Sequence, residues 1–499
     1  MKRISKSQYL KGLQCPKALW LYRNRRDLAP EVSEGRQFIF DTGHEVGVLA
    51  QRYFGDGAEI TEPYYKIDQA IRSTSKAVRR GEDLIFEATA CSESGAYSRI
   101  DIFKKVAGSD IWDMIEVKSS TGVKDYHIDD MALQRHAFSG AGYRIGKSIL
   151  MHVNNSYVRS GNLDLQSLFT LEDCTVIVEE KLAEIGSTVG DLIKIINSRI
   201  EPEIAIGGHC SNPFECDYIP YCWDHVPDYS VYDIFSGGKL ETLLERGVLD
   251  ICEVPDEFDL TDRQVVEIRA YRENRIHKDI TAITEFLERL KYPLYYLDYE
   301  TIAPAVPLFD NSSPYETIPF QFSLHVQSKK GGDLKHTEFL HRGTDDPRPG
   351  FLEALVDACR KRGSVVVYNQ PFESGVNNKL ALKFPAYAAR LEKINDRMVD
   401  LLVPFRSRHL YHPEMEGSAS LKSVLPAFVP DLTYEGLAID NGEIASITYS
   451  RCIRGLVPEE EKPQIFEDLR KYCKLDTLAE VRLVEILYQN SSKPMAVRS

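Results

Sequence analysis

The sequence contains no run of apolar residues that approaches the roughly 18–20 needed to cross a membrane, and it contains no internal repeat or low-complexity tract. Positive charge is also in deficit, since 61 Lys and Arg stand against 75 Asp and Glu, a formal net charge of −14. This balance excludes a globally basic, histone-like binder of nucleic acid. A local basic groove remains compatible with it, and an acidic excess is expected where carboxylates gather around cations.

No signal peptide is expected either, because the first residues, Met1 to Gln8, are polar and lack an apolar stretch. We therefore expect a cytoplasmic protein with no membrane partner. In that compartment the ten cysteines are more typical of free or metal-bound thiols than of disulfides. The composition, 43% hydrophobic and 27% charged, is that of a soluble globular chain and excludes disordered, collagen-like and small disulfide-rich proteins.

The patterning predicts an α/β chain of several domains. The first region, 1–226, has predicted strands at 84–88, 98–103 and 112–118 and predicted helices at 129–141 and 178–196. Short helical patterns over 227–290 indicate a helical connector that ends in one long helix at 271–290. The third region, 291–490, has predicted strands at 295–300, 320–326 and 365–368 and a last helix at 467–488, and 491–499 is expected to be a frayed tail.

Asp101 and the segment from Glu116 to Lys118 form the clearest candidate active site. Residues i and i+2 of a strand share a face, so Glu116 and Lys118 project together. A hairpin that turns at Gly108 can bring Asp101 beside Glu116. Two close carboxylates repel each other unless a cation is present, which predicts a Mg²⁺ or Mn²⁺ site. Such a metal activates water for attack on a phosphodiester, and Lys118 can position that water or stabilise the transition state.

Two residues outside the hairpin complete this candidate site. His44 lies in a helical pattern that ends near Phe54 and can supply a third metal ligand. Gln134 lies on the helix that follows the last strand and is placed to orient Lys118 or a phosphate.

Taken together, His44, Asp101, Glu116, Lys118 and Gln134 resemble the motif of the RecB-like branch of the PD-(D/E)XK nucleases, which includes the nuclease of CRISPR adaptation. The resemblance covers roughly the first 225 residues and implies a restriction-endonuclease-like fold. It also implies that the histidine and the two carboxylates bind metal, while the lysine and glutamine are catalytic. The family usually has tyrosine four residues after the glutamine, where this chain has Phe138.

Three cysteines, Cys210, Cys216 and Cys222, recur with five residues between them in a stretch rich in Gly, Pro and Asn, which suits a loop around an inorganic centre. In the RecB-like family one early and three late cysteines hold a 4Fe-4S cluster, and with Cys15 these positions match that layout. Zinc remains the rival occupant, although the short step of two to four residues typical of zinc sites is absent. The other six are interpreted as ordinary buried thiols: Cys91, Cys174, Cys252, Cys359, Cys452 and Cys473.

A second group of carboxylates lies in the third region. Asp298 and Glu300 share one face of a strand, and Tyr472 and Asp476 lie one helical turn apart. Between them, Glu373 follows the strand at 365–368, with Asp400 as an alternative acid. Carboxylates from separate elements suit two cations about 4 Å apart that clamp both oxygens of an in-line displacement, while the tyrosine hydroxyl can orient the water.

This second pattern resembles the DEDD exonucleases of RNase H-like fold, in their tyrosine subclass. The resemblance implies that Asp298, Glu300, Glu373 and Asp476 bind Mg or Mn and that Tyr472 is catalytic. Glu373 stands where most of the family has aspartate, so this site is either active, altered or silent.

The whole chain resembles an uncharacterised bacterial family that joins these two nuclease modules. The expected function is metal-dependent hydrolysis of phosphodiester bonds, with DNA ends or single strands as the expected substrate. The alternative is a nucleic-acid-binding iron–sulfur protein whose RNase H-like domain is a catalytically silent scaffold. Protein partners are not predicted.

Overall fold

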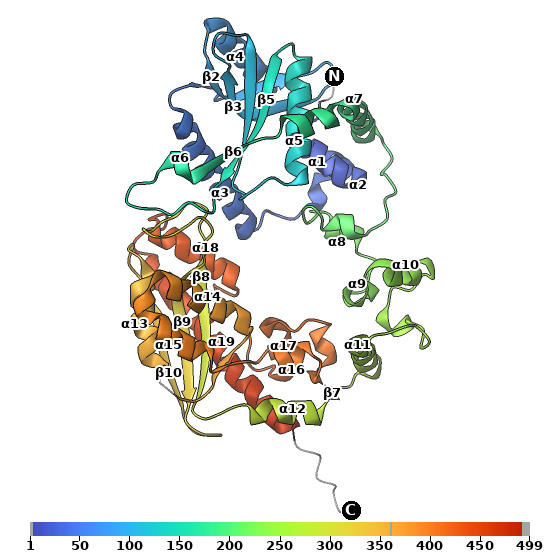
Figure 1. Ribbon diagram of the computed structural model, residues 1–499. Coiled ribbons are helices and arrows are strands. Elements are labelled where there is room, and N and C mark those ends of the chain that lie inside the picture. The colour runs from blue at the N-terminus through green and yellow to red at the C-terminus, as the bar shows by residue number, and fades with distance from the viewer. Residues whose placement is uncertain (1–2, 360–361, 492–499) are drawn as a thin grey trace, which may run out of the picture. The chain divides into compact units, whose positions relative to one another are not determined.

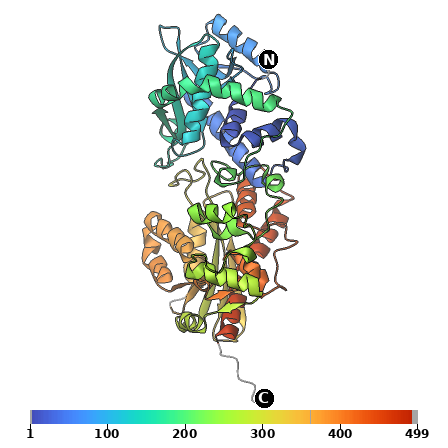
Figure 2. The same ribbon diagram turned by 90° about the vertical axis from the view of Figure 1, so that its right-hand side faces the viewer.

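The computed structural model describes residues 3–359 and 362–491 and is drawn in Figure 1 and, turned by 90°, in Figure 2. The chain forms two compact units. Unit 1 comprises Met1–His225 and Pro304–Tyr315, and unit 2 comprises Val226–Ala303 and Glu316–Ser499. Apart from Ser491, the predicted frayed tail lies outside the described residues. None of the described helices is long and apolar enough to span a membrane.

Unit 1 is built on one mixed sheet whose strands follow the order β1-β2-β3-β4-β5-β6. The strands are β1 (Ala58–Glu59), β2 (Leu84–Cys91), β3 (Tyr97–Lys105), β4 (Ile111–Lys118), β5 (Arg144–Val153) and β6 (Phe169–Asp173). The central β2-β3-β4 meander is antiparallel, whereas β5 runs parallel to β4 and follows it through a helical crossover, α5 (Asp125–Gly140). The predicted hairpin forms, and its turn contains Gly108 at φ 71°, where a glycine is favoured.

Helices cover both faces of this sheet. The described helices of unit 1 besides α5 are α1 (Lys6–Gln14), α2 (Pro16–Asn24), η1 (Arg26–Leu28), α3 (Glu34–Phe54), α4 (Ile67–Arg80), α6 (Leu165–Leu168), α7 (Thr175–Asn197), η2 (Gly208–Cys210) and α8 (Ile219–Cys222). One hydrophobic core joins α1, α4, α5 and α7 to the sheet. The other core packs α3 against the opposite face and also takes in Ala305 and Val306.

The sheet of unit 2 has the strand order β10-β9-β8-β11-β12. Its strands are β8 (Leu294–Ile302), β9 (Ile318–Gln327), β10 (Leu334–Leu340), β11 (Val365–Val367) and β12 (Met398–Asp400). The first three form an antiparallel meander, and β11 and β12 add parallel strands on the other side of β8. A separate pair, β7 (His277–Lys278) and β13 (Leu410–Tyr411), is antiparallel.

Alternation along β8 divides its side chains between two helical layers. Tyr295, Leu297 and Tyr299 share a core with α13 (Pro347–Ala358), α14 (Gln370–Lys383) and α15 (Pro385–Asn395). Leu294 and Tyr296 share the other core with α12 (Ile280–Glu288) and α19 (Lys462–Asn490). Because side chains alternate, Asp298 and Glu300 continue the row that faces α19. The remaining described helices of the carboxyl-terminal part are α16 (Val403–Arg406), η4 (Pro413–Met415), α17 (Leu421–Phe428) and α18 (Gly442–Ile453).

The segment 227–290 is helical, as expected, but it clusters with unit 2 instead of standing alone. It holds α9 (Val231–Ile234), α10 (Gly237–Glu245), η3 (Ile251–Glu253) and α11 (Asp262–Glu273), which share a hydrophobic cluster. The predicted single helix at 271–290 is wrong. Helix α11 ends where Asn274 adopts a left-handed conformation, φ 45°, and α12 starts anew with Asp279 as its cap, accepting a 3.0 Å hydrogen bond from the Ala282 N–H.

The expected third region, 291–490, is also interrupted, because Pro304–Tyr315 clusters with unit 1. The Arg159 guanidinium donates to the carbonyls of Pro307 and Leu308, both at 2.9 Å. The Gly161 N–H donates to Asp310 at 2.8 Å. These contacts depend on residues about 150 positions apart, which local patterning does not show.

Candidate functional site

Unit 1 gathers four of its five predicted site residues at the end of the β3–β4 hairpin and on α5. The Lys118 ammonium lies 2.6 Å from Oε1 of Glu116, and the Gln134 amide donates to Oε2 of the same carboxylate at 2.7 Å. Asp101 accepts a 2.6 Å hydrogen bond from the Val117 N–H, which places it beside Glu116. Glu116 and Gln134 are buried, at 2% and 0% exposure, while 24% of the Lys118 side chain is exposed.

The pKa values of Asp101 and Glu116 are shifted in opposite directions. Burial opposes ionisation of Glu116, but the ammonium groups of Lys118 and Lys6 outweigh it and hold its pKa well below the ordinary value. Burial and then the charge of Glu116 raise the pKa of Asp101 to about 8. A cation bound between the two would remove this repulsion.

His44 does not join this cluster. It lies exposed on α3, and no hydrogen bond or ion pair connects it to Asp101 or Glu116 within the described residues. Helix α3 buries Val46 and Ala50 against the sheet. Residues two positions apart on a helix point to nearly opposite sides, so burying Val46 turns His44 outward.

Three further charged residues reach the cluster without having been predicted. Asp130 lies one turn before Gln134 on α5 and binds Lys118 at 2.8 Å. Lys6, on α1, binds Glu116 at 2.7 Å. Glu87 adopts φ 57°, a left-handed conformation that is strained for glutamate, and burial raises its pKa. Of these three residues, only Asp130 could have been found from the sequence, because it lies four residues before Gln134 on a predicted helix.

Phe138, at the position where the resemblance leads one to expect tyrosine, is fully buried. Its ring packs against Phe103 with 4.9 Å between centroids. The side chain is therefore part of the hydrophobic core of unit 1.

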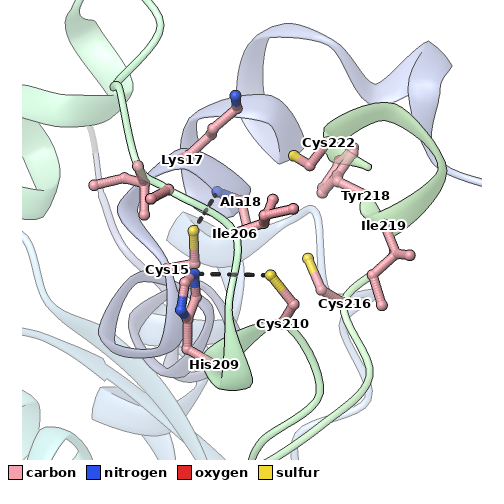
Figure 3. Close-up of a pocket in the computed structure, with 12 residues that line it drawn as sticks. Cys15, Lys17, Ala18, Ile206, His209, Cys210, Cys216, Tyr218, Ile219 and Cys222 are labelled. Atoms are coloured by element: carbon pink, nitrogen blue, oxygen red, sulfur yellow. Dashed lines mark hydrogen bonds between the residues drawn. The ribbon is translucent and has the colours of Figure 1, made fainter. Parts of the chain in front are cut away.

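The four predicted cysteines of unit 1 line one pocket, shown in Figure 3. Cys15 comes from the junction of α1 and α2, Cys210 from η2, Cys222 from α8, and Cys216 from the loop between η2 and α8. His209 also lines this pocket, with Nε2 3.8 Å from Sγ of Cys210.

The loop that carries these cysteines is fastened to α1. The Gln14 amide donates to the carbonyls of His209 and Phe214 at 2.8 and 2.6 Å. The Lys11 ammonium binds Asp217 at 2.9 Å. These bonds hold the carboxyl-terminal end of α1 against the cysteine loop.

The spacing of the four sulfurs can be compared with that of ligands around a single zinc ion. Sulfurs around one tetrahedral zinc, at bonds of about 2.3 Å, lie about 3.8 Å apart. In the described part of the chain, no three of these sulfurs all lie within 4.8 Å of one another. Burial raises the pKa of the Cys216 thiol.

The remaining thiols depart in part from their interpretation as buried bystanders. All ten cysteines are free. Cys252 is exposed and Cys91 is only partly buried, so the expectation of burial is wrong for these two. Cys473 belongs to the acidic cluster of unit 2.

Unit 2 brings its predicted carboxylates together between β8, α14 and α19. Ligand atoms of Asp298, Glu300 and Cys473 all lie within 4.8 Å of one another. The Cys473 thiol lies 3.6 Å from Oδ2 of Asp298. Burial raises the pKa of Asp298 to about 7, and burial followed by the charge of Asp298 raises the pKa of Asp476 well above its ordinary value.

Glu373 and Asp400, the two candidate acids, differ in their hydrogen bonds. Asp400 accepts from the backbone N–H groups of Asn369 and Leu402 at 3.2 and 3.0 Å, so it fixes the chain after β12. Glu373 is 2% exposed, and its Oε2 has no hydrogen-bond partner in the described part of the chain. Glu373 is therefore the acid that is available to a cation.

Glu480, one turn beyond Asp476 on α19, also belongs to this cluster. It is 1% exposed, and neither carboxylate oxygen has a hydrogen-bond partner of normal geometry among the described groups. Burial, and then the charges of Asp298 and Glu373, raise its pKa well above the ordinary value. Its spacing from Asp476, again four residues on a helix, was the available signal in the sequence.

Two tyrosines and a helix terminus border the carboxylates. Tyr434 donates a short hydrogen bond to Asp476. Gly442, the first residue of α18, lies against the Tyr472 hydroxyl and Glu300: a Cβ there would be 4.0 Å from Oη and 3.7 Å from Oε2. The positive end of α18 therefore lies beside Glu300.

Comparisons with known proteins match only parts of the chain. Residues 295–420 match a family described as a domain of unknown function (DUF2779). This segment contains Asp298, Glu300, Glu373 and Asp400 and ends before α19. No solved structure matches.

Curated relatives come from Ureaplasma and Mycoplasma species. The chain is 25% identical over 275 residues to "Uncharacterized protein UU173" of Ureaplasma parvum, covering 50% of this chain and 39% of that one. It is 27% identical over 214 residues to "Uncharacterized protein MG366 homolog" of Mycoplasma pneumoniae and 26% identical over 217 residues to "Uncharacterized protein MG366" of Mycoplasma genitalium. Each of the latter alignments covers 39% of this chain and 32% of the relative. The chain thus spans well under half the length of the curated relatives it matches.

Proposed function

We propose that this chain is a metal-dependent nuclease that hydrolyses phosphodiester bonds of DNA, at ends or in single strands. The observation that carries the proposal is the convergence of Asp101, Glu116, Lys118 and Gln134 in one buried cluster of unit 1. These residues come from two strands and the helix that follows them, and they lie together despite the cost of burying charge.

Unit 1 is proposed to be a PD-(D/E)XK nuclease of the RecB-like type. Asp101 and Glu116 would hold one Mg²⁺ or Mn²⁺ ion, and Asp130 anchors Lys118 on its other side. Such an ion lowers the pKa of bound water and polarises the phosphodiester. Lys118, charged at neutral pH, would stabilise the negative charge that grows on the phosphate oxygens.

Unit 2 is proposed to be an RNase H-like domain of the DEDD type. Its sheet, with Asp298 and Glu300 on central strand β8, supports this interpretation. Asp298, Glu300, Glu373 and Asp476 would hold the metal ions, and the hydroxyl of Tyr472 borders the site where a water would attack.

The cysteine pocket is proposed to hold a 4Fe-4S cluster. Four thiols line one pocket, and in the described part of the chain no three of their sulfurs lie within 4.8 Å of one another, which supports this choice over a single zinc ion. The cluster would fix α1 and α2 to the carboxyl-terminal loop of the unit, a structural contribution that needs no redox step.

The test is a cleavage assay on anaerobically purified protein with labelled single- and double-stranded DNA and RNA, in Mn²⁺ or EDTA. We compare the unchanged chain with Lys118→Ala, Asp298→Asn and the double variant. Mn²⁺-dependent cleavage of DNA that the double variant lacks is the expected result. Absence of cleavage of every substrate in Mn²⁺ would refute the proposal.

Two features favour a second candidate, a nucleic-acid-binding iron–sulfur protein with a silent unit 2. Glu373 replaces a shorter acid, and Glu480 adds a carboxylate that the DEDD pattern does not contain. In that case Asp298→Asn would leave cleavage unchanged, while Lys118→Ala would abolish it.

A further inference from the structure

Helix α1 places a second lysine in the carboxylate cluster of unit 1. Nζ of Lys6 lies 2.7 Å from Oε1 of Glu116 and 4.0 Å from Oδ2 of Asp130. Lys118 binds the same two carboxylates, at 2.6 and 2.8 Å, and shares the same Glu116 oxygen. Two ammonium groups therefore meet on one buried carboxylate, although Lys6 and Glu116 are 110 positions apart in the sequence.

The backbone around Lys6 is fixed to the strand that carries Asp101. Ile4 is fully buried, and its N–H donates to the Gly95 carbonyl at 2.9 Å. Its carbonyl accepts from the Tyr97 N–H, at the first residue of β3, at 3.0 Å. Lys6 thus projects from an anchored point, and 30% of its side chain remains exposed.

The other end of α1 is equally fixed, by the cysteine loop. Gln14 is the last residue of α1 and binds that loop through two carbonyls, and Cys15 follows it in the cysteine pocket. A helix of nine residues is about 13 Å long, so α1 is a short rigid strut between the two sites. The sequence provides one lysine at the start of this strut and one cysteine directly after it.

We propose that Lys6 is a second catalytic lysine of unit 1 and contacts the phosphate of bound nucleic acid. The inference rests on the proposed nuclease function. A divalent ion at Asp101 and Glu116 would take over the carboxylate that the two ammonium groups now share. Both lysines then border the ion on which the phosphate is held. Charge develops on the phosphate oxygens during in-line attack, and a fixed cation that is partly shielded from water stabilises it strongly.

The competing explanation is that Lys6 forms a purely structural ion pair with Glu116. Two substitutions distinguish this from a catalytic role. Lys6→Gln keeps a hydrogen-bond donor for Glu116 but removes the charge, whereas Lys6→Met removes both. If Lys6 only holds Glu116 in place, Lys6→Gln cleaves at nearly the unchanged rate. If Lys6 acts on the phosphate, both variants lose about 100-fold in the single-turnover rate.

The experiment uses the full chain with its cysteine centre intact and Asp298→Asn to silence unit 2. Arg3→Met is the matched control, because Arg3 lies on the same amino-terminal segment but pairs with Asp68 at 2.7 Å, outside the cluster. Single-turnover cleavage of labelled DNA is measured together with Mn²⁺ affinity by electron paramagnetic resonance.

We expect Lys6→Gln and Lys6→Met to lose the rate while their Mn²⁺ affinity stays equal or rises, because a competing cation has been removed. The control should keep both properties. Unchanged cleavage by Lys6→Gln overturns the inference alone. Loss of rate that is matched by an equal loss of Mn²⁺ affinity does the same, since it indicates a structural role. Absence of Mn²⁺-dependent cleavage in the parent with Lys6 intact overturns the nuclease function of unit 1 and the inference with it.

Discussion

Replacing Asp298 by asparagine should stabilise unit 2 in the absence of metal. Burial raises the pKa of Asp298 from 3.8 to about 7. Each tenfold change in proton affinity corresponds to about 1.4 kcal/mol, so ionisation in the folded state costs about 4 kcal/mol above pH 7. Because Asp298 is only partly buried, water screens part of this cost, and we expect a net effect of about 2 kcal/mol.

The pH dependence follows from the direction of the shift. A carboxyl whose pKa is raised on folding favours the folded state least when both states are ionised, so stability falls as pH rises from about 4 to about 7. Asparagine cannot ionise and lacks this dependence. Asp298→Asn should therefore gain most at pH 8 and less than half as much at pH 5.

Thermal unfolding in EDTA measures the gain. About 2 kcal/mol in a unit of this size raises the melting temperature by about 4–8 °C. In the unchanged chain Mn²⁺ should raise the melting temperature, because it binds only the folded state. At one hundred times its Kd, Mn²⁺ binding adds about 2.7 kcal/mol to the free energy of unfolding. Asp298→Asn should abolish this response.

The control is Asp333→Asn, an exposed carboxylate in the loop between β9 and β10. The Asp298→Asn and Asp333→Asn chains both also carry Glu116→Gln, which removes the metal site proposed for unit 1. A lower melting temperature for Asp298→Asn at pH 8 in EDTA would refute the reasoning, and so would a full Mn²⁺ response in that variant.

Three further outcomes are expected. Lys118→Ala should abolish Mn²⁺-dependent cleavage by unit 1 and leave the far-ultraviolet circular dichroism of the chain unchanged. The fold should persist because 24% of the Lys118 side chain is exposed and Lys6 still binds Glu116. The control is Lys147→Ala, which replaces an exposed lysine on β5. Cys216→Ser should remove the absorbance near 400 nm that a 4Fe-4S cluster gives and make unit 1 prone to aggregation. A colourless unchanged chain with stoichiometric zinc would contradict this. The control is Cys252→Ser, at an exposed cysteine, and this variant protein should stay brown. Glu480→Gln should raise the melting temperature in EDTA by about 2–5 °C, because it removes the charge of a buried carboxylate that has no hydrogen-bond partner of normal geometry among the described groups. A fall in the melting temperature would show that the glutamate is held in a way that the carboxamide cannot replace.

Local periodicity was sufficient to place the main strands and helices. The predicted strands at 84–88, 98–103 and 112–118 are β2, β3 and β4, each one to three residues longer than predicted. The hairpin alternation then placed Asp101, Glu116 and Lys118 correctly beside one another. The same alternation on β8 placed Asp298 and Glu300 on the face toward α19.

Residues that depend on tertiary packing escaped this reasoning. His44 lies on a correctly predicted helix, but the burial of Val46 and Ala50 sets the rotation of α3 and turns it away. Lys6 is a single lysine in a polar amino-terminal segment, and nothing local links it to Glu116. The helix predicted at 271–290 failed because one residue, Asn274, leaves the right-handed conformation.

The two carboxylate clusters differ in how their charge is balanced. In unit 1, Glu116 and Asp130 already bind Lys6 and Lys118, so the chain supplies two of the cations the cluster needs. In unit 2, no described lysine or arginine forms an ion pair with Asp298, Glu300, Glu373, Asp476 or Glu480. Burial, and then the charge of Asp298, raise the pKa of Glu300 and Asp476 well above their ordinary values, although the charge of Lys422 opposes this. Buried carboxylates without a counter-ion either bind protons or bind metal. Chelation should therefore destabilise unit 2 far more than unit 1, because the metal proposed for unit 2 is the counter-ion that its carboxylates otherwise lack.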